Sequence, residues 1–425
     1  MSPPASCRTW TSVRSTPISV AVAETALDAP RASHFPASAR PDYNVAVGYL
    51  RGFARLMVFA LHSVAAYYPG PFPASGPVFH QSIPLLDAKH FAGARILVAF
   101  NEISLMSLLF FLSGLFLWPS LTKKGGAGFL RERLVRLGAP FLVCGGLVAA
   151  IAYYPSYLQS APLHPGLGDY ARTWLAPDRW TTGPAWFLLI LFFYDLVAIG
   201  LYAVAPDWGA RLAKLAAHAA AQPLRFCLLV MLVSGVAYIP LALILGPYDW
   251  WHISIFWLQK SRVLEYAAYF FSGAAVGAFG LSRGLLARDG GLAKRWYWWG
   301  LAAIPAFLIA ANLLRLTVSR HREQDLVWGT IADVGWVICC AICSFALMAI
   351  FVRFARRTPL LDNFANNSYG MYIVHYMFVT WTQYALLQVA MPAPAKWACV
   401  LAVTVAGSWS LAGALRRIPI VARNV

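Results

Sequence analysis

The chain has 425 residues, of which 60% are apolar and 12% charged, and its formal net charge is +17. Soluble domains carry about 25% charged residues, so this composition excludes an ordinary soluble enzyme. The basic residues lie mainly in short loops beside apolar segments, where Lys and Arg set membrane topology. That placement argues against nucleic-acid binding despite the high positive charge.

Residues 1–43 are rich in Pro, Ser and Ala, and we predict a disordered tail there. The sequence that follows is a series of apolar segments about as long as the 20 residues that a helix needs to cross a bilayer. We predict an all-α fold, a polytopic transmembrane helical bundle over residues 44–416, with a short cytoplasmic tail at 417–425. The ten predicted spans are about 45–68, 92–118, 134–155, 184–205, 224–245, 262–281, 295–314, 328–352, 368–390 and 396–415.

Most basic residues fall in the N-terminal tail, in the loops after the even-numbered spans and after the last span. Basic residues favour the cytoplasm, so both termini are predicted to face inward. The outward loops at 69–91, 156–183 and 246–261 mix Trp, Tyr, His and Asp. This composition suits sugar binding, but interfacial aromatic belts produce it equally well.

Three of the seven cysteines, Cys339, Cys340 and Cys343, lie close together in the apolar stretch WVICCAICSFALM. No histidine is near them in the sequence, so packing in the helix explains them better than zinc. We expect neither a metal site nor a disulfide framework.

The first span holds three ionisable residues, Arg51, Arg55 and His62, which are functional candidates because such groups are costly in a membrane. At 100° per residue, Arg51 and His62 lie within about 20° of each other on one helix face, roughly 16 Å apart along the axis. Arginine suits phosphate recognition, and histidine suits general-base work on a hydroxyl. The alternative is that Arg51 snorkels to the interface and His62 only bonds across helices.

The R-x10-H spacing of Arg51 and His62 resembles the signature of membrane-bound acyltransferase family three. Four further segments resemble this family and follow in order: FFLSGLFLWPSL (110–121), FLRERLVRLGAPFLV (129–143), GPAWFLLILFF (183–193) and NSYGMYIVHY (367–376). The resemblance covers roughly residues 43–415. The family includes O-antigen and exopolysaccharide acetyltransferases and the succinyltransferase that acts on periplasmic glucans.

The resemblance implies that His62 is the catalytic base and that Arg51 contacts the donor or its coenzyme. It implies that Arg133 and Arg136 meet the phosphates of acyl-coenzyme A (acyl-CoA) from the cytoplasmic side, although topological anchoring is an alternative for both. The residues expected to contact substrate are Arg51, Glu102, Trp186, Tyr372 and His375. Ser368, Tyr372 and His375 lie on one helical stripe, where helix–helix hydrogen bonding is the alternative.

The chain departs from the family pattern in its second span. Where the family often has a histidine before F-F, this chain has SLMSLLFF, with Asn101 and Glu102 further away. Glu102 could orient His62 or pair with an arginine. Ser113 and Gly114, just after F-F, favour close helix packing. The other carboxylates in spans, to which the sequence assigns no role, are Asp195, Glu265 and Asp333.

These observations predict an integral membrane O-acyltransferase of a bacterial-type plasma (inner) membrane. It would transfer an acetyl or succinyl group from acyl-CoA to a hydroxyl of a cell-surface or periplasmic carbohydrate or glycolipid. The alternative is a multi-pass secondary transporter that uses the buried His, Arg and Glu as a proton or substrate path. The sequence has no paired halves with matched Gly- or Pro-interrupted spans, which argues against a transporter. The oligomeric state is not indicated.

Overall fold

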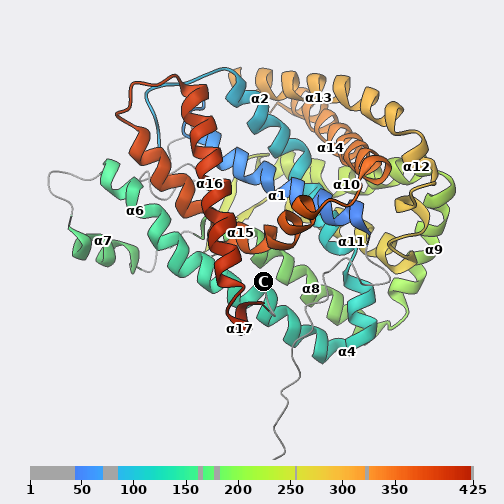
Figure 1. Cartoon of the computed structure of the whole chain (residues 1–425). Helices are drawn as coiled ribbons and strands as arrows, with labels where there is room; N and C mark the ends of the chain where they lie inside the picture. The colour runs from blue at the N-terminus through green and yellow to red at the C-terminus, as the bar shows by residue number, and fades with distance from the viewer. Residues whose placement is uncertain are drawn as a thin grey trace, which may run out of the picture. The chain divides into compact units, whose positions relative to one another are not determined.

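The computed structural model describes residues 44–69, 85–160, 166–176, 182–253, 256–320 and 325–422, and the predicted tail at 1–43 lies outside them. The described residues are almost entirely helical (Figure 1). The α-helices are α1 (Val45–Ala65), α2 (Gly93–Phe100), α3 (Met106–Gly114), α4 (Leu117–Arg133), α5 (Ala139–Leu142), α6 (Ala149–Ser160), α7 (Leu167–Trp174), α8 (Trp186–Val204), α9 (Trp208–Ala221), α10 (Pro223–Leu245), α11 (Val263–Phe279), α12 (Gly291–Lys294), α13 (Trp296–Ser319), α14 (Leu326–Phe354), α15 (Pro359–Leu386), α16 (Ala393–Leu415) and α17 (Pro419–Ala422).

Each of the ten predicted spans corresponds to a helical stretch. Within the described ranges, eight stretches are long and apolar enough to cross a membrane, and α11 gives a ninth if it is counted with Gly284–Lys294, from which it is bent by 83°. The predicted all-α membrane bundle is therefore confirmed. The eight stretches are Val45–Ala65, Gly93–Gly114, Leu117–Ser160, Gly183–Val204, Pro223–Leu245, Trp296–Ser319, Leu326–Phe354 and Ala393–Leu415.

α15, which holds the segment predicted as the ninth span, is not among these eight. It carries polar residues that an isolated membrane helix avoids, among them Asn367, Ser368 and His375, all of which are buried. α15 packs against α1, α6 and α16 (Figure 1). Its neighbours, more than its own hydropathy, keep these side chains away from lipid, as is usual for polar residues in a bundle.

α3 and α11 approach each other backbone to backbone, as Ser113 and Gly114 led us to expect. A Cβ atom added at Gly114 would lie 1.9 Å from the carbonyl oxygen of Phe270, and one added at Gly273 would lie 2.0 Å from that of Phe111. Gly273 and Gly277 are four residues apart, the small-xxx-small spacing of tight membrane helix pairs. Only glycine fits at these positions.

Three segments of the second and third predicted spans are π-helical, so each of their hydrogen-bonded turns contains one residue more than a turn of α-helix. They are η3 (Asn101–Leu105), η4 (Leu134–Gly138) and η5 (Val143–Val148). η3 contains Glu102, and η4 contains Arg136. Wide turns of this kind are rare and recur at functional sites, which directs attention to both residues.

Some elements were not predicted. The loop expected at 246–261 contains an antiparallel hairpin of β1 (Trp250–Ile253) and β2 (Phe256–Gln259), with Trp250 opposite Gln259. The described chain also has short 3-10 turns, η6 (Gly183–Ala185) and η7 (Gly284–Leu286). The loop after α8 contains the amphipathic helix α9, which packs against α11. α4 is interrupted at Gly125, whose φ of 69° is readily adopted only by glycine.

Candidate functional site

His62 lies in the last turn of α1 with its side chain partly buried. Its ring is 5.5 Å from the ring of His375 and 5.0 Å, edge-on, from that of Tyr376, measured between centroids. Gln383 of α15 donates hydrogen bonds to the carbonyl oxygens of His62 (2.9 Å) and Ser63 (3.2 Å). The end of α1 is thus tied to α15, which holds the two histidines side by side.

The other end of α1 is also fixed. The side chain of Asn44 accepts hydrogen bonds from the backbone N–H groups of Ala46 and Val47, as an N-cap residue does. The same side chain donates to the carbonyl oxygen of Leu281 at 2.7 Å. With both ends anchored, the rotation of α1 about its axis is defined, and with it the direction of the Arg51–His62 stripe.

His375 is fully buried behind His62. Its Nδ1 lies 2.6 Å from the carbonyl oxygen of Tyr372, and its ring stacks on Phe59 at 4.7 Å. Its buried Nε2 has no hydrogen-bond partner within the described part of the chain. In this conformation His375 supports the ring of His62 and does not face open space, so its predicted contact with substrate stays a prediction.

The arginines of α1 face neighbouring helices. The guanidinium of Arg51 lies 4.9 Å above the ring of Phe116, at the end of α3. That of Arg55 donates to Ser368 Oγ at 2.7 Å and lies 5.6 Å from the ring of Tyr369. The predicted stripe is therefore turned into the protein.

Tyr372 and Trp186 extend the site toward the start of α8. The hydroxyl of Tyr372 donates to the carbonyl oxygen of Pro184. The ring of Phe187 lies 6.3 Å from that of Tyr372 and 6.4 Å from that of Trp186. The structure thus connects His62, His375, Tyr372 and Trp186 through a continuous series of ring contacts.

The two arginines predicted to meet coenzyme phosphates have different surroundings. Arg133 Nε lies 3.2 Å from Asp195 Oδ2 in a buried ion pair, and its guanidinium lies over Phe129 at 4.5 Å. Arg136 is 45% exposed, and its Nη1 is 3.2 Å from Glu132 Oε1. Arg136 can therefore reach a ligand, whereas Arg133 is held by Asp195.

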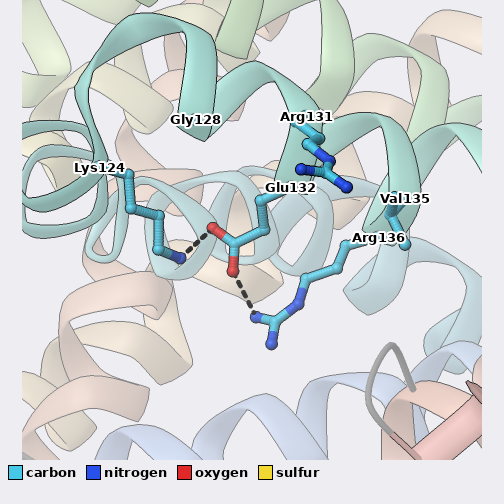
Figure 2. Close-up of a pocket in the computed structure, with 6 residues that line it drawn as sticks. All are labelled: Lys124, Gly128, Arg131, Glu132, Val135 and Arg136. Atoms are coloured by element: carbon cyan, nitrogen blue, oxygen red, sulfur yellow. Dashed lines mark hydrogen bonds and ion pairs between the residues drawn. The ribbon is translucent and has the colours of Figure 1, made fainter.

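Arg136 borders a surface hollow of about 330 Å³ on α4 and η4 (Figure 2). Arg131 and Lys124 border it too, and the carboxylate of Glu132 lies between Lys124 and Arg136 (Figure 2). Three cations against one carboxylate leave a net positive surface, which suits phosphate groups. Lys124 and Arg131 were not among the residues predicted to meet the coenzyme, although they lie in the same basic run as Arg133 and Arg136.

Glu102 pairs with an arginine and not with His62. Arg262 Nη1 lies 2.9 Å from Glu102 Oε2, and the Arg262 guanidinium lies 4.1 Å from the ring of Trp336. Trp336 Nε1 in turn donates to Glu265 Oε1 at 3.3 Å. The carboxylates of Glu102 and Glu265, left open by the sequence, thus belong to one cluster around Arg262.

Asp333 extends this cluster, accepting a hydrogen bond from the Tyr238 hydroxyl at 3.1 Å. In the described ranges no group of three or more His, Cys, Asp or Glu side chains could hold a metal ion. Cys339 Sγ and Cys343 Sγ lie 3.7 Å apart on successive turns of α14, buried among apolar neighbours. The carboxylates therefore form contacts between helices, and the two thiols contact each other within α14.

The family model of acyltransferase family 3, described as an acyltransferase domain, matches residues 44–413. No curated protein and no solved structure matches the chain. The family match covers the whole bundle, from the cap of α1 to the end of α16, and includes every candidate residue described above. The chain therefore belongs to acyltransferase family 3 and is a multi-pass membrane acyltransferase that transfers groups other than amino-acyl groups.

Proposed function

We propose that the protein transfers an acetyl group from acetyl-CoA to a hydroxyl of a cell-surface or periplasmic carbohydrate. The observation that carries this proposal is the partly buried residue His62, whose ring is fixed against buried His375 at the end of an anchored helix. Histidine is well suited to accept a proton from a hydroxyl and return it to a leaving group.

The reaction uses His62 as a proton carrier. His62 accepts the proton of the acceptor hydroxyl while the hydroxyl oxygen attacks the thioester carbonyl carbon. The carbon–sulfur bond then breaks, and the coenzyme A sulfur takes the proton from His62. The products are an O-acetyl ester and the free thiol, so no proton is gained or lost overall. Contact with His375 and Tyr376 keeps the His62 ring in one orientation throughout.

The donor would bind with its phosphates at the basic hollow of Lys124, Arg131 and Arg136. Charge-assisted bonds from such side chains are among the strongest that proteins make to phosphate. Arg51 lies on the same face of α1 as His62, roughly 16 Å away along the axis, and would contact the donor between its two ends. The proposed location is a bacterial-type inner membrane, with both termini and the hollow on the cytoplasmic side.

Replacement of His62 tests the proposal. We expect His62→Ala in detergent to lower both acetyl-CoA hydrolysis and acetyl transfer at least about 100-fold, the usual contribution of a general base. His218→Ala is the matched control, because His218 is exposed on α9, and it should retain wild-type rates. Normal turnover by His62→Ala would remove the catalytic assignment. In a separate experiment, mass spectrometry of surface glycans from a deletion strain would identify the acyl group and the acceptor together.

A further inference from the structure

Glu102 and Arg262 form an ion pair whose two members differ in exposure. The Arg262 side chain is 1% exposed, whereas the Glu102 side chain is 42% exposed. The neighbours of Glu102 in the π turn, Asn101 and Ile103, are buried. The opening is therefore confined to the face of the helix that carries Glu102, where Val98, Ala99 and Met106, one turn away, are also partly exposed.

The open side of Glu102 is not explained by contact with lipid. A charged side chain facing lipid in the middle of a span costs roughly 2.5–3.5 kcal/mol on insertion scales. η3 packs against α1 and α14, and Glu102 pairs with the residue that precedes α11. Protein covers these sides of the turn, so water or a polar ligand is the natural occupant of the remaining side.

Aromatic rings connect this ion pair to the β-hairpin. Tyr266, one turn after Arg262, has its ring 6.2 Å from that of Trp186, and the Trp186 ring meets that of Trp250 edge-on at 5.8 Å. Trp186 and Trp250 are both partly exposed. Aromatic faces beside a hydrogen-bond acceptor suit a sugar ring, which has an apolar C–H face and donates through its hydroxyls.

The same tryptophan is connected to the catalytic histidine. Trp186 contacts Phe187, whose ring lies against Tyr372, and Tyr372 lies 5.6 Å from His375 beside His62. Trp186 therefore lies between the Glu102–Arg262 pair and the His62 site. A ligand bound over Trp186 would extend toward the Glu102–Arg262 pair on one side and toward His62 on the other.

We propose that Glu102, Trp186 and Trp250 form the acceptor-binding subsite, and that the acceptor bound there is a neutral sugar. This inference rests on the proposed function, because it names the acceptor of the same reaction. Arg262 is buried behind Glu102, so the charge that the pair presents is negative and repels uronates and phosphorylated sugars. Asp249, next to Trp250, pairs with Lys260 at 3.5 Å and adds no net charge.

Thiol labelling tests whether Glu102 faces water. In nanodiscs, the Glu102→Cys variant is treated with a charged, membrane-impermeant thiosulfonate, and Ser104→Cys, in the same π turn but buried, is the control. We expect Cys at position 102 to react at least about tenfold faster, after subtraction of the reaction of the native cysteines, because a charged reagent reaches only thiols in contact with water. Equal rates at the two positions would overturn the proposal.

Kinetics with maltohexaose as acceptor and acetyl-CoA as donor test binding. We expect Glu102→Gln and Trp250→Ala each to raise the KM for maltohexaose about tenfold, with the KM for acetyl-CoA and the rate of acetyl-CoA hydrolysis unchanged. Trp251→Ala is the matched control, because Trp251 follows on the same strand, is 44% exposed and points to the opposite face. It should leave all three quantities unchanged. Oligogalacturonate should be a poor acceptor.

The outcomes separate the two proposals. If wild-type protein hydrolyses acetyl-CoA through His62 but does not acetylate maltohexaose, or if Trp250→Ala behaves like Trp251→Ala, the acceptor subsite is wrong and the proposed function stands. If His62→Ala hydrolyses acetyl-CoA at the wild-type rate, the proposed function itself is wrong.

Discussion

Arginines only a few residues apart in the basic run of α4 and η4 have different surroundings, and these decide what each can do. Arg136 is open to a hollow that it shares with Lys124 and Arg131, whereas Arg133 is paired with Asp195. Arg133 and Arg136 were both predicted to meet coenzyme phosphates, because the sequence around them does not distinguish the two. Their difference arises from Asp195, which lies 62 positions beyond Arg133 in the sequence and meets it only in the folded protein.

At Arg136 and Arg131 we expect effects on donor binding. Arg136→Ala and Arg131→Ala should each raise the KM for acetyl-CoA about tenfold, because each removes a charge-assisted contact worth about 1.5–3 kcal/mol. The effect should shrink as salt is added, since these side chains are exposed. Initial rates over a range of acetyl-CoA concentrations measure it. Arg211→Ala, an exposed arginine of α9, is the control, and an equal rise there would contradict a specific phosphate site.

At Arg133 we expect an effect on stability. Arg133→Met would leave the carboxylate of Asp195, which is 2% exposed, without its partner, and loss of one member of a buried pair costs about 3–5 kcal/mol. Thermal unfolding in detergent should show a lower Tm, and Arg133→Met combined with Asp195→Leu should recover much of the loss. A single variant with a wild-type Tm and a raised KM for acetyl-CoA would instead place Arg133 at the donor.

Among the helices, the contact of α3 with α11 depends most strictly on side-chain size. Gly273→Ala would bring a Cβ atom to 2.0 Å from the Phe111 carbonyl oxygen, so the two helices must separate. We expect a lower Tm and less folded protein on size-exclusion chromatography. Gly200→Ala in α8, where the added Cβ has nothing within 4 Å, should be neutral. An unchanged Tm for Gly273→Ala would mean that the two helices can move apart at little cost.

The spans could be predicted because hydropathy is a local property of about 20 residues. α15 was predicted as a span over residues 368–390, although its burial depends on α1, α6 and α16. The hairpin could not be predicted, since Trp250 and Trp251 fit an interfacial belt equally well. The same limit applies to the candidate site. The period of a single helix predicted that Arg51 and His62 share one face. No local pattern predicts that Glu102 pairs with Arg262, which lies 160 positions away.

In the molecule as a whole, a buried ion pair joins two segments that are distant in the sequence. Lys396 Nζ, at the start of α16, lies 2.7 Å from Asp87 Oδ2, and both side chains are almost fully buried. Lys396 also donates to the carbonyl oxygen of Leu387, and the Asp87 N–H donates to that of Ala66. The pair fixes the end of α1, and hence His62, relative to the turn between α15 and α16.

The predicted orientation of the whole bundle can be tested at its C-terminus. A green fluorescent protein fused after residue 425 should fluoresce in bacterial cells, and alkaline phosphatase at the same point should be inactive, because both termini are predicted to face the cytoplasm. Fusions truncated at Met391, in a turn that is predicted to face outward, should give the opposite pair of results. A C-terminal fusion with active phosphatase would reverse the side assigned to the basic hollow.

The π turn at Asn101–Leu105 sets how the second half of its span is rotated about the helix axis relative to the first half. An extra residue in one turn rotates everything that follows by about 100° relative to an uninterrupted α-helix. Glu102 lies in this turn and meets Arg262, and Gly114 follows the turn and meets Phe270, three residues before Gly273 of α11. A regular helix could align one of these partners with α11 but would swing the other away. The widened turn thus allows a single span to place both the Glu102 carboxylate and Gly114 against α11.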